Sequence, residues 1–113
     1  SLAHPEDTLR KFSHALQTRG FRFLHILAPC PTGWKSEPAQ GIQLVRLAVQ
    51  SGLFPVCEIR DGVELTINIE PDFSAQALNT YLSLQGRFRK SAVASEALGQ
   101  DIQLHWQRLR KAL

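Results

Sequence analysis

The sequence lacks the features that mark secreted disulfide-rich and membrane-spanning proteins. It has 113 residues and only two cysteines, Cys30 and Cys57, too few for a secreted disulfide framework. Its longest apolar runs, such as ILAPC at 26–30, fall far short of the ~20 residues that a membrane-spanning helix needs. The N-terminus lacks the basic stretch and apolar core of a signal peptide. We therefore expect a cytoplasmic protein with reduced thiols and no membrane contact.

Composition and length predict a single globular domain over 1–113. Hydrophobic residues make up 43% and charged residues 20% of the chain, which excludes a disordered tail. A chain of this length can bury a core without cross-links. No internal repeat, low-complexity tract or linker divides it.

Positive charge gathers in the last part of the chain. Residues 85–113 hold six Lys or Arg and two acidic residues, a net charge of +4, so the total of +3 leaves −1 for residues 1–84. Only one aromatic residue, Phe88, interrupts the basic stretch GRFRK, whereas nucleic-acid-binding surfaces usually combine cations with several aromatic platforms. The pattern favours a solvated surface or a protein contact over nucleic acid.

Hydrophobic periodicity predicts the order helix, strand, helix, strand, strand, helix, helix. The strand over 21–29 is almost continuously apolar, which is typical of a parallel strand covered on both faces. Asp61-Gly62 between two apolar runs predicts the turn of a hairpin. The expected elements are a helix over 3–20, a strand over 21–29, a loop over 30–40, a helix over 41–52, a hairpin over 54–71, a helix over 72–86, a loop over 87–95 and a helix over 95–113.

This order predicts an α/β fold. A strand, a crossover helix and a second strand form a right-handed βαβ unit with a parallel strand pair. Two parallel strands and a hairpin are few for a complete α/β domain, whose sheet usually has about five or six strands. We therefore expect the last third of a larger parallel sheet: a βαβ unit, an added β-hairpin and terminal helices.

Cys30 occupies a rigid position at the carboxyl end of the first predicted strand. Ligands of open parallel sheets bind at this end of the strands. Pro29 and Pro31 restrict the backbone on both sides of the cysteine, so they hold its sulfur in one direction. The residues that follow offer a hydroxyl, a close backbone approach and an indole that could exclude water: Thr32, Gly33 and Trp34.

The residues alone leave two roles open for Cys30. A nucleophilic thiol needs a base within reach, and the sequence places no histidine beside it. Zinc needs four ligands, and C-x-x-C and histidine pairs at ligand spacing are absent. A disulfide with Cys57, itself expected to be a buried strand residue, is disfavoured in a reducing compartment. What remains is a structural cysteine, or one ligand of an iron–sulfur cluster whose other ligands lie elsewhere.

Three separated segments resemble a known family. They are LHILAPCPTGW (24–34), GIQLVRLAVQSGLFPVCEIRDG (41–62) and YLSLQGRFRK (81–90). In this order they resemble the C-terminal portion of the β subunit of 2-oxoacid:ferredoxin oxidoreductases, with the pyruvate branch, pyruvate synthase, as the best fit. The opening SLAHPEDTLRKFSHAL (1–16) is similar to the segment that precedes them in that family.

The resemblance implies a part of a thiamine-diphosphate-binding α/β domain. The assembled enzymes decarboxylate a 2-oxoacid oxidatively, form an acyl-CoA, and pass electrons through [4Fe-4S] clusters to ferredoxin or flavodoxin. Cys30 is then implied to be a cluster ligand. The residues implied to line the site are Thr32, Gly33 and Trp34. Two roles stay open for the basic residues Arg87, Arg89 and Lys90. They face another subunit or an acidic electron carrier, or they are only solvated.

Two motifs of the family are absent from this chain. These are the GDG…N motif that binds the diphosphate and its Mg²⁺, and the C-x-x-C that supplies the early cluster ligands. Because a [4Fe-4S] cluster needs about four cysteines, we expect the isolated chain to bind neither cluster nor thiamine diphosphate and to be inactive. The alternative function is a non-catalytic scaffold module that docks through an exposed sheet edge.

Overall fold

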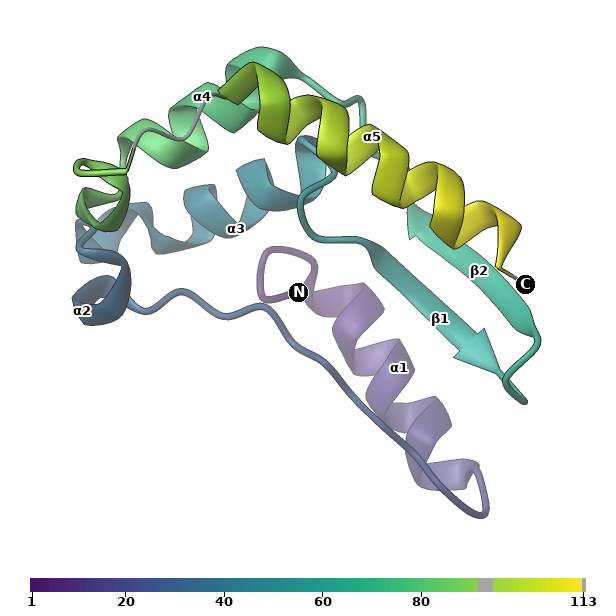
Figure 1. The fold of residues 1–113 in the computed structure, drawn as a ribbon. Helices are drawn as coiled ribbons and strands as arrows, with labels where there is room; N and C mark the ends of the chain where they lie inside the picture. The colour runs from purple at the N-terminus through teal and green to yellow at the C-terminus, as the bar shows by residue number, and fades with distance from the viewer. Residues whose placement is uncertain (92–94, 113) are drawn as a thin grey trace.

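The computed structural model describes residues 1–91 and 95–112 (Figure 1). The predicted loop over 87–95 and the predicted last helix extend into residues 92–94 and Leu113, which lie outside the described residues. None of the described helices has the length and apolar character needed to cross a lipid bilayer. The elements are α1 (Pro5–Gln17), α2 (Pro31–Trp34), the 3-10 turn η1 (Pro38–Gln40), α3 (Gly41–Gln50), β1 (Val56–Arg60), β2 (Glu64–Ile69), α4 (Ala75–Ser83), the 3-10 turn η2 (Gly86–Phe88) and α5 (Ser95–Lys111).

Helix α3 carries the centre of the core. Its Leu44, Val45 and Ala48 are fully buried and pack with Trp34 of α2 and Tyr81 of α4. Side chains at these spacings share one helix face, so the amphipathic pattern predicted for 41–52 is confirmed. The spacing of Ile42, Val45 and Val49 predicts that all three face inward. Val45 and Val49 do, whereas Ile42 lies at the edge of this face and is exposed.

Helix α5 packs on α4 through a second cluster. Leu78 of α4 contacts Ile102 and Trp106 of α5, with Leu98 and Leu109 partly buried beside them. The helical spacing of Leu98, Ile102, Trp106 and Leu109 predicts that they share one inward face, and the structure confirms this. The Trp106 indole N–H donates a buried hydrogen bond to the carbonyl of Gly52, just beyond α3, at 2.7 Å. This bond satisfies a polar group that burial would otherwise penalise.

Strands β1 and β2 form an antiparallel hairpin, as predicted. Opposite residues include Ile59 and Leu65. Asp61 and Gly62 have positive φ angles of 51° and 74°, the backbone conformation that tight two-residue hairpin turns require. The Asp-Gly pair therefore has a structural role in the turn.

The predicted parallel strand pair and βαβ unit are wrong for the described residues. Their sheet has two strands, β1 and β2, paired antiparallel. Residues 21–29 instead run as an extended segment beside α1 (Figure 1). In the described structure their backbone receives one backbone hydrogen bond, from the Leu2 N–H to the Leu27 carbonyl at 3.3 Å. A strand needs a neighbouring strand for its backbone groups, and no described strand lies there.

The predicted loop over 30–40 contains two short helical turns. Pro31 stands in the first turn of α2 and Pro38 in that of η1. Proline suits these positions because its fixed φ is helical and its missing N–H needs no partner there. The loop prediction for 30–40 takes Pro31 and Pro38 as residues that exclude regular structure. That prediction is wrong here, because both prolines start helical turns.

Two glycines give a matched pair of stability predictions. At Gly52 φ is +82° and an added Cβ would lie 2.9 Å from the Phe73 ring, whereas at Gly99, inside α5, the closest atom would be Leu78 Cδ2 at 3.9 Å. Gly52→Ala is expected to lower the free energy of unfolding by at least about 1–2 kcal/mol. Gly99→Ala is expected to raise it by about 0.5–1 kcal/mol. Urea unfolding monitored by circular dichroism measures both, and shifts of the same sign would contradict the packing described at these glycines.

Candidate functional site

Cys30 is the N-cap residue of α2. Its backbone is extended, with φ −130° and ψ 91°, and its side chain is exposed. The Gly33 N–H donates to Cys30 Sγ at 3.4 Å. A Cβ at Gly33 would lie 3.2 Å from that sulfur, so glycine lets the amide approach it closely. The turn therefore presents an exposed sulfur that already accepts one N–H.

The three residues predicted to line a cofactor site differ in exposure. Thr32 and Gly33 are exposed beside Cys30. Trp34 is only 9% exposed and belongs to the core. Its ring meets the Tyr81 ring edge to face, with the centroids 6.2 Å apart. The structure thus keeps Thr32 and Gly33 with the sulfur and buries Trp34 underneath.

The Cys30 turn fits one ligand of a cluster and no more than one. Among the described residues, no group of three His, Cys, Asp or Glu side chains is gathered closely enough to hold a metal ion. The exposed sulfur and its N–H donor match a cluster thiolate, whose sulfur commonly accepts such bonds. A cluster bound to this sulfur would need its other ligands from outside the described residues.

Cys57 is a different kind of cysteine. It lies in β1 opposite Ile67 and is half-buried, and it is not bonded to Cys30. Burial raises the pKa of its thiol and so disfavours the thiolate. These properties fit the packing role that the sequence predicts for Cys57.

The three basic residues predicted to bind a partner are not equivalent. Arg87 is exposed as a residue, yet its guanidinium donates hydrogen bonds to Gln85 and to the Tyr81 hydroxyl. Arg89 and Lys90 follow it and are also exposed; no ion pair of theirs is found within the described residues. The charge available to an external partner therefore lies mainly on Arg89 and Lys90.

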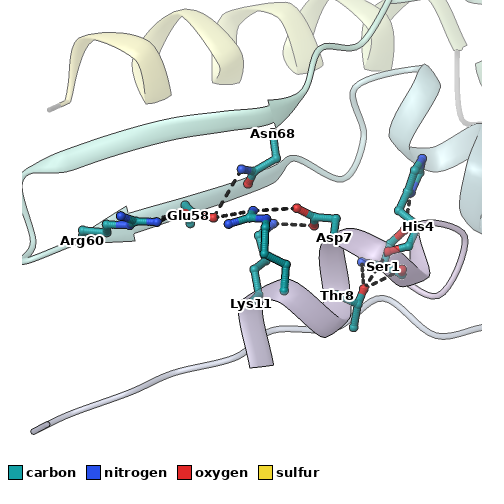
Figure 2. A network of polar contacts seen from close by, with 9 residues as sticks. Ser1, His4, Asp7, Thr8, Lys11, Glu58, Arg60 and Asn68 are labelled. Carbon is teal, nitrogen blue, oxygen red and sulfur yellow. Dashed lines mark hydrogen bonds and ion pairs between the residues drawn. The ribbon is translucent and has the colours of Figure 1, made fainter. Parts of the chain in front are cut away.

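A polar network joins α1 to the hairpin, and sequence reasoning missed it (Figure 2). Glu58 of β1 accepts hydrogen bonds from Arg10 at 2.7 Å and from Arg60 at 2.6 Å. It also accepts one from Asn68 at 3.3 Å, while Arg10 donates to Asp7 at 2.9 Å. Arg10 and Glu58 are 48 positions apart, so no local pattern reveals the pair.

This network shifts the acidity of its carboxylates. The bond from Arg10, supported by Arg60, lowers the pKa of Glu58 from 4.5 to about 2, although burial acts in the opposite direction. Burial alone would raise the pKa of Asp7, but the bonds from Lys11 and Arg10 outweigh it and lower the pKa. Both carboxylates are therefore held ionised, as groups that accept charged donors are.

The first 26 residues expose an unusual amount of apolar side chain. Helix α1 buries none of its residues; Leu9 and Leu16 of its stripe are 67% and 81% exposed. In the following segment Phe21 and Phe23 are 91% and 76% exposed. We call these residues, with Phe12, Leu24 and Ile26, the N-terminal apolar surface. The periodicity that predicts a buried face is present, but no described element covers it.

Comparison with known proteins identifies relatives of this chain. Ketoisovalerate oxidoreductase subunit VorB of Pyrococcus horikoshii is 38% identical over an alignment of 113 positions, which covers 98% of this chain and 36% of the relative. Pyruvate synthase subunit PorB of Methanocaldococcus jannaschii is 40% identical over 88 residues, 78% of this chain and 29% of the relative. The chain is homologous to the β subunits of 2-oxoacid:ferredoxin oxidoreductases.

The homology confirms the resemblance seen in the three sequence segments. The chain spans about a third of the length of the curated relatives that it matches. Relatives named for ketoisovalerate and for pyruvate match at similar identity, so the preference for the pyruvate branch stays a prediction. No family model matches the chain, and neither does any solved structure.

The pKa of Glu58 predicts an acid-sensitive part of the stability. Because the folded pKa of about 2 lies below the ordinary 4.5, the stabilisation is complete above pH 4.5 and is lost as the pH falls from 4.5 to 2. Glu58→Gln is expected to lower the free energy of unfolding at pH 7 by about 1 kcal/mol, a modest value because Arg10 is exposed. At pH 2 the variant and the parent chain should be equally stable.

Urea titrations at pH 7, 4 and 2 measure this dependence. Glu37→Gln is the matched control, since Glu37 is exposed and its side chain does not cap η1. Loss of the same stability at every pH in Glu58→Gln would contradict the ionic origin of the effect.

Proposed function

We propose that this chain is part of a 2-oxoacid:ferredoxin oxidoreductase and that Cys30 donates its thiolate to a [4Fe-4S] cluster. The observation that carries the proposal is the Cys30 turn, with an exposed sulfur, prolines on both sides and the Gly33 N–H directed at Sγ. An electron-transfer ligand benefits from such a rigid setting, because little has to reorganise when charge arrives.

The cluster and thiamine diphosphate with Mg²⁺ belong to the whole assembly in this proposal. When bound, they supply oxidative decarboxylation of the 2-oxoacid, acyl transfer to coenzyme A and electron transfer. This chain's own contribution is a single sulfur ligand held by its turn, with Thr32 and Gly33 exposed next to it. Trp34 supports the turn from the core side. The isolated chain is expected to be inactive.

The N-terminal apolar surface supports a role as one part of an assembly. Large exposed apolar surfaces usually mark contacts with other protein surfaces. Residues 21–29 also have backbone groups that a neighbouring strand outside this chain could pair with. We propose that the other parts of the oxidoreductase cover α1 and this segment, and that ferredoxin or flavodoxin meets the basic Arg89 and Lys90.

A second candidate function is a non-catalytic scaffold. The same apolar surface favours it, because docking through α1 and residues 21–29 needs no thiolate. The two functions differ in what happens to iron when the cysteine is changed.

Cys30→Ser tests the cluster proposal. The assembly is purified anaerobically from its source through this chain, and its iron, acid-labile sulfide and thiamine diphosphate are measured alongside native mass spectrometry. Serine is expected to remove one cluster, because its hydroxyl is a poor ligand for iron compared with a thiolate. Cys57→Ser is the control and should keep its iron. An unchanged iron content in Cys30→Ser would end the ligand role and leave the scaffold function.

A second variant tests the docking surface. Phe23→Ser is expected to weaken retention of companion polypeptides at least about tenfold, since burial of one large apolar side chain contributes about 1.5–3 kcal/mol. Val63→Ser is the matched control, because Val63 is 71% exposed at the hairpin turn and lies outside the N-terminal apolar surface. Equal retention by both variants in co-purification at matched expression would contradict docking through this surface.

A further inference from the structure

The turn that carries Cys30 is held from outside by a second turn about 50 residues further along the chain. Lys35, which ends α2, has a left-handed backbone with φ 52°. The Gly86 N–H of η2 donates to the Lys35 carbonyl at 2.8 Å. The end of the Cys30 turn is therefore anchored to η2.

Gly86 allows this contact because it has no side chain. A Cβ at Gly86 would lie 2.8 Å from Lys35 Cβ and 3.1 Å from the Lys35 carbonyl oxygen. Both atoms are at or next to the backbone, so they cannot move aside as the end of a flexible side chain could. Any larger residue at position 86 must push the two turns apart.

Arg87, the residue after Gly86, contacts the same turn through the Trp34 ring. Its guanidinium carbon lies over the Trp34 ring, 4.8 Å from the centroid, and over the Phe88 ring at 4.6 Å. Two acceptors fix its orientation: Gln85 Oε1 accepts from Nε at 2.7 Å, and the Tyr81 hydroxyl accepts from a terminal nitrogen at 3.1 Å. A planar guanidinium can stack and donate in this way, whereas an ammonium group cannot reproduce both.

Gln85 makes the orientation of Arg87 rigid. Its side chain is fully buried and its amide donates to the Tyr81 carbonyl at 2.7 Å. The amide oxygen is thereby turned toward Arg87. A series of contacts then runs from Gln85 through Arg87 and Trp34 to Cys30, because the backbone N–H of Trp34 donates to the Cys30 carbonyl at 2.8 Å.

We propose that Gly86 and Arg87 are positioning residues for Cys30. They hold the turn over 31–35 so that the Gly33 N–H stays directed at the Cys30 sulfur. The inference rests on the proposed function only where the sulfur is taken as a cluster ligand. In the assembly, the held N–H stabilises the more negative reduced cluster, and this raises its reduction potential.

The first experiment measures the turn without any cluster. Hydrogen exchange by NMR follows the amides of Trp34 and Ser36, which donate to the carbonyls of Cys30 and Pro31. In Arg87→Ala and Gly86→Ala, the hydrogens of these two amides are expected to exchange about tenfold faster. This factor corresponds to a decrease of about 1.4 kcal/mol in the free energy of local opening. Amides in the middle of α3 should keep their rates, which shows that each variant is still folded.

Matched variants separate geometry from charge. Arg89→Ala removes an equal charge two positions away and is expected to leave Trp34 and Ser36 unchanged. Arg87→Lys keeps the charge and should exchange nearly as fast as Arg87→Ala, since lysine lacks the planar fork. Exchange at the parent rate in both Arg87→Ala and Gly86→Ala would overturn the proposal. Exchange at the parent rate in Arg87→Lys would show that the charge, and not the planar guanidinium, holds the turn.

The second experiment measures the midpoint potential of the cluster in the purified assembly by redox titration with electron paramagnetic resonance. Arg87→Ala and Gly86→Ala are expected to keep the iron content and to shift one potential to more negative values than Arg89→Ala does. A potential equal to that of Arg89→Ala would overturn the positioning role. An unchanged iron content in Cys30→Ser would instead overturn the proposal that Cys30 is a cluster ligand. The hydrogen-exchange experiment would still test whether Gly86 and Arg87 hold the turn over 31–35.

Discussion

The close packing around helix α3 is the constraint on which the rest of the described structure depends. At its C-terminal end, the Phe54 N–H donates to the Ala48 carbonyl at 3.0 Å, which fixes where the chain turns toward β1. At its start, Pro29 packs so tightly on Gly41 that an added Cβ would lie 3.0 Å away. Because Leu44, Val45 and Ala48 of α3 are fully buried, the helix gives the neighbouring Cys30 turn a rigid base.

The N-terminal part of the chain and the helical part differ in how much of their apolar surface is buried within the described structure. Helices α3, α4 and α5 bury their apolar faces against one another and enclose the Trp106 hydrogen bond. Helix α1 is tied to the hairpin by the ion pair of Arg10 with Glu58. The large apolar side chains of α1 and of residues 21–26 are exposed. Ion pairs at a surface contribute little, so the stability of the described structure rests on the helical part. The exposed part is consistent with a chain that spans about a third of its relatives' length.

The ion pairs of Glu58 and the packed guanidinium of Arg87 act on different parts of the structure. Glu58 and its cations are remote in the sequence from the cysteine turn and act on the attachment of α1. Arg87 lies next to the turn and is held by two acceptors and two rings. The basic residues of GRFRK therefore differ in role. The guanidinium of Arg87 mainly contacts residues of this chain, whereas Arg89 and Lys90 are exposed.

Local patterns in the sequence determined the four longer helices α1, α3, α4 and α5, the Asp61-Gly62 turn, the inward face of α5 and the segments that mark the family. Each of these depends on neighbouring residues or on a helical period. Only the tertiary structure decided the remaining features. The segment over 21–29 has the apolar character of a strand, but a strand forms only where a second backbone offers hydrogen bonds, and the described chain has none to offer there. Likewise the pairing of Arg10 with Glu58 and the grip of Arg87 on Trp34 join residues about 50 positions apart. Such contacts depend on how the elements pack, which no local pattern encodes.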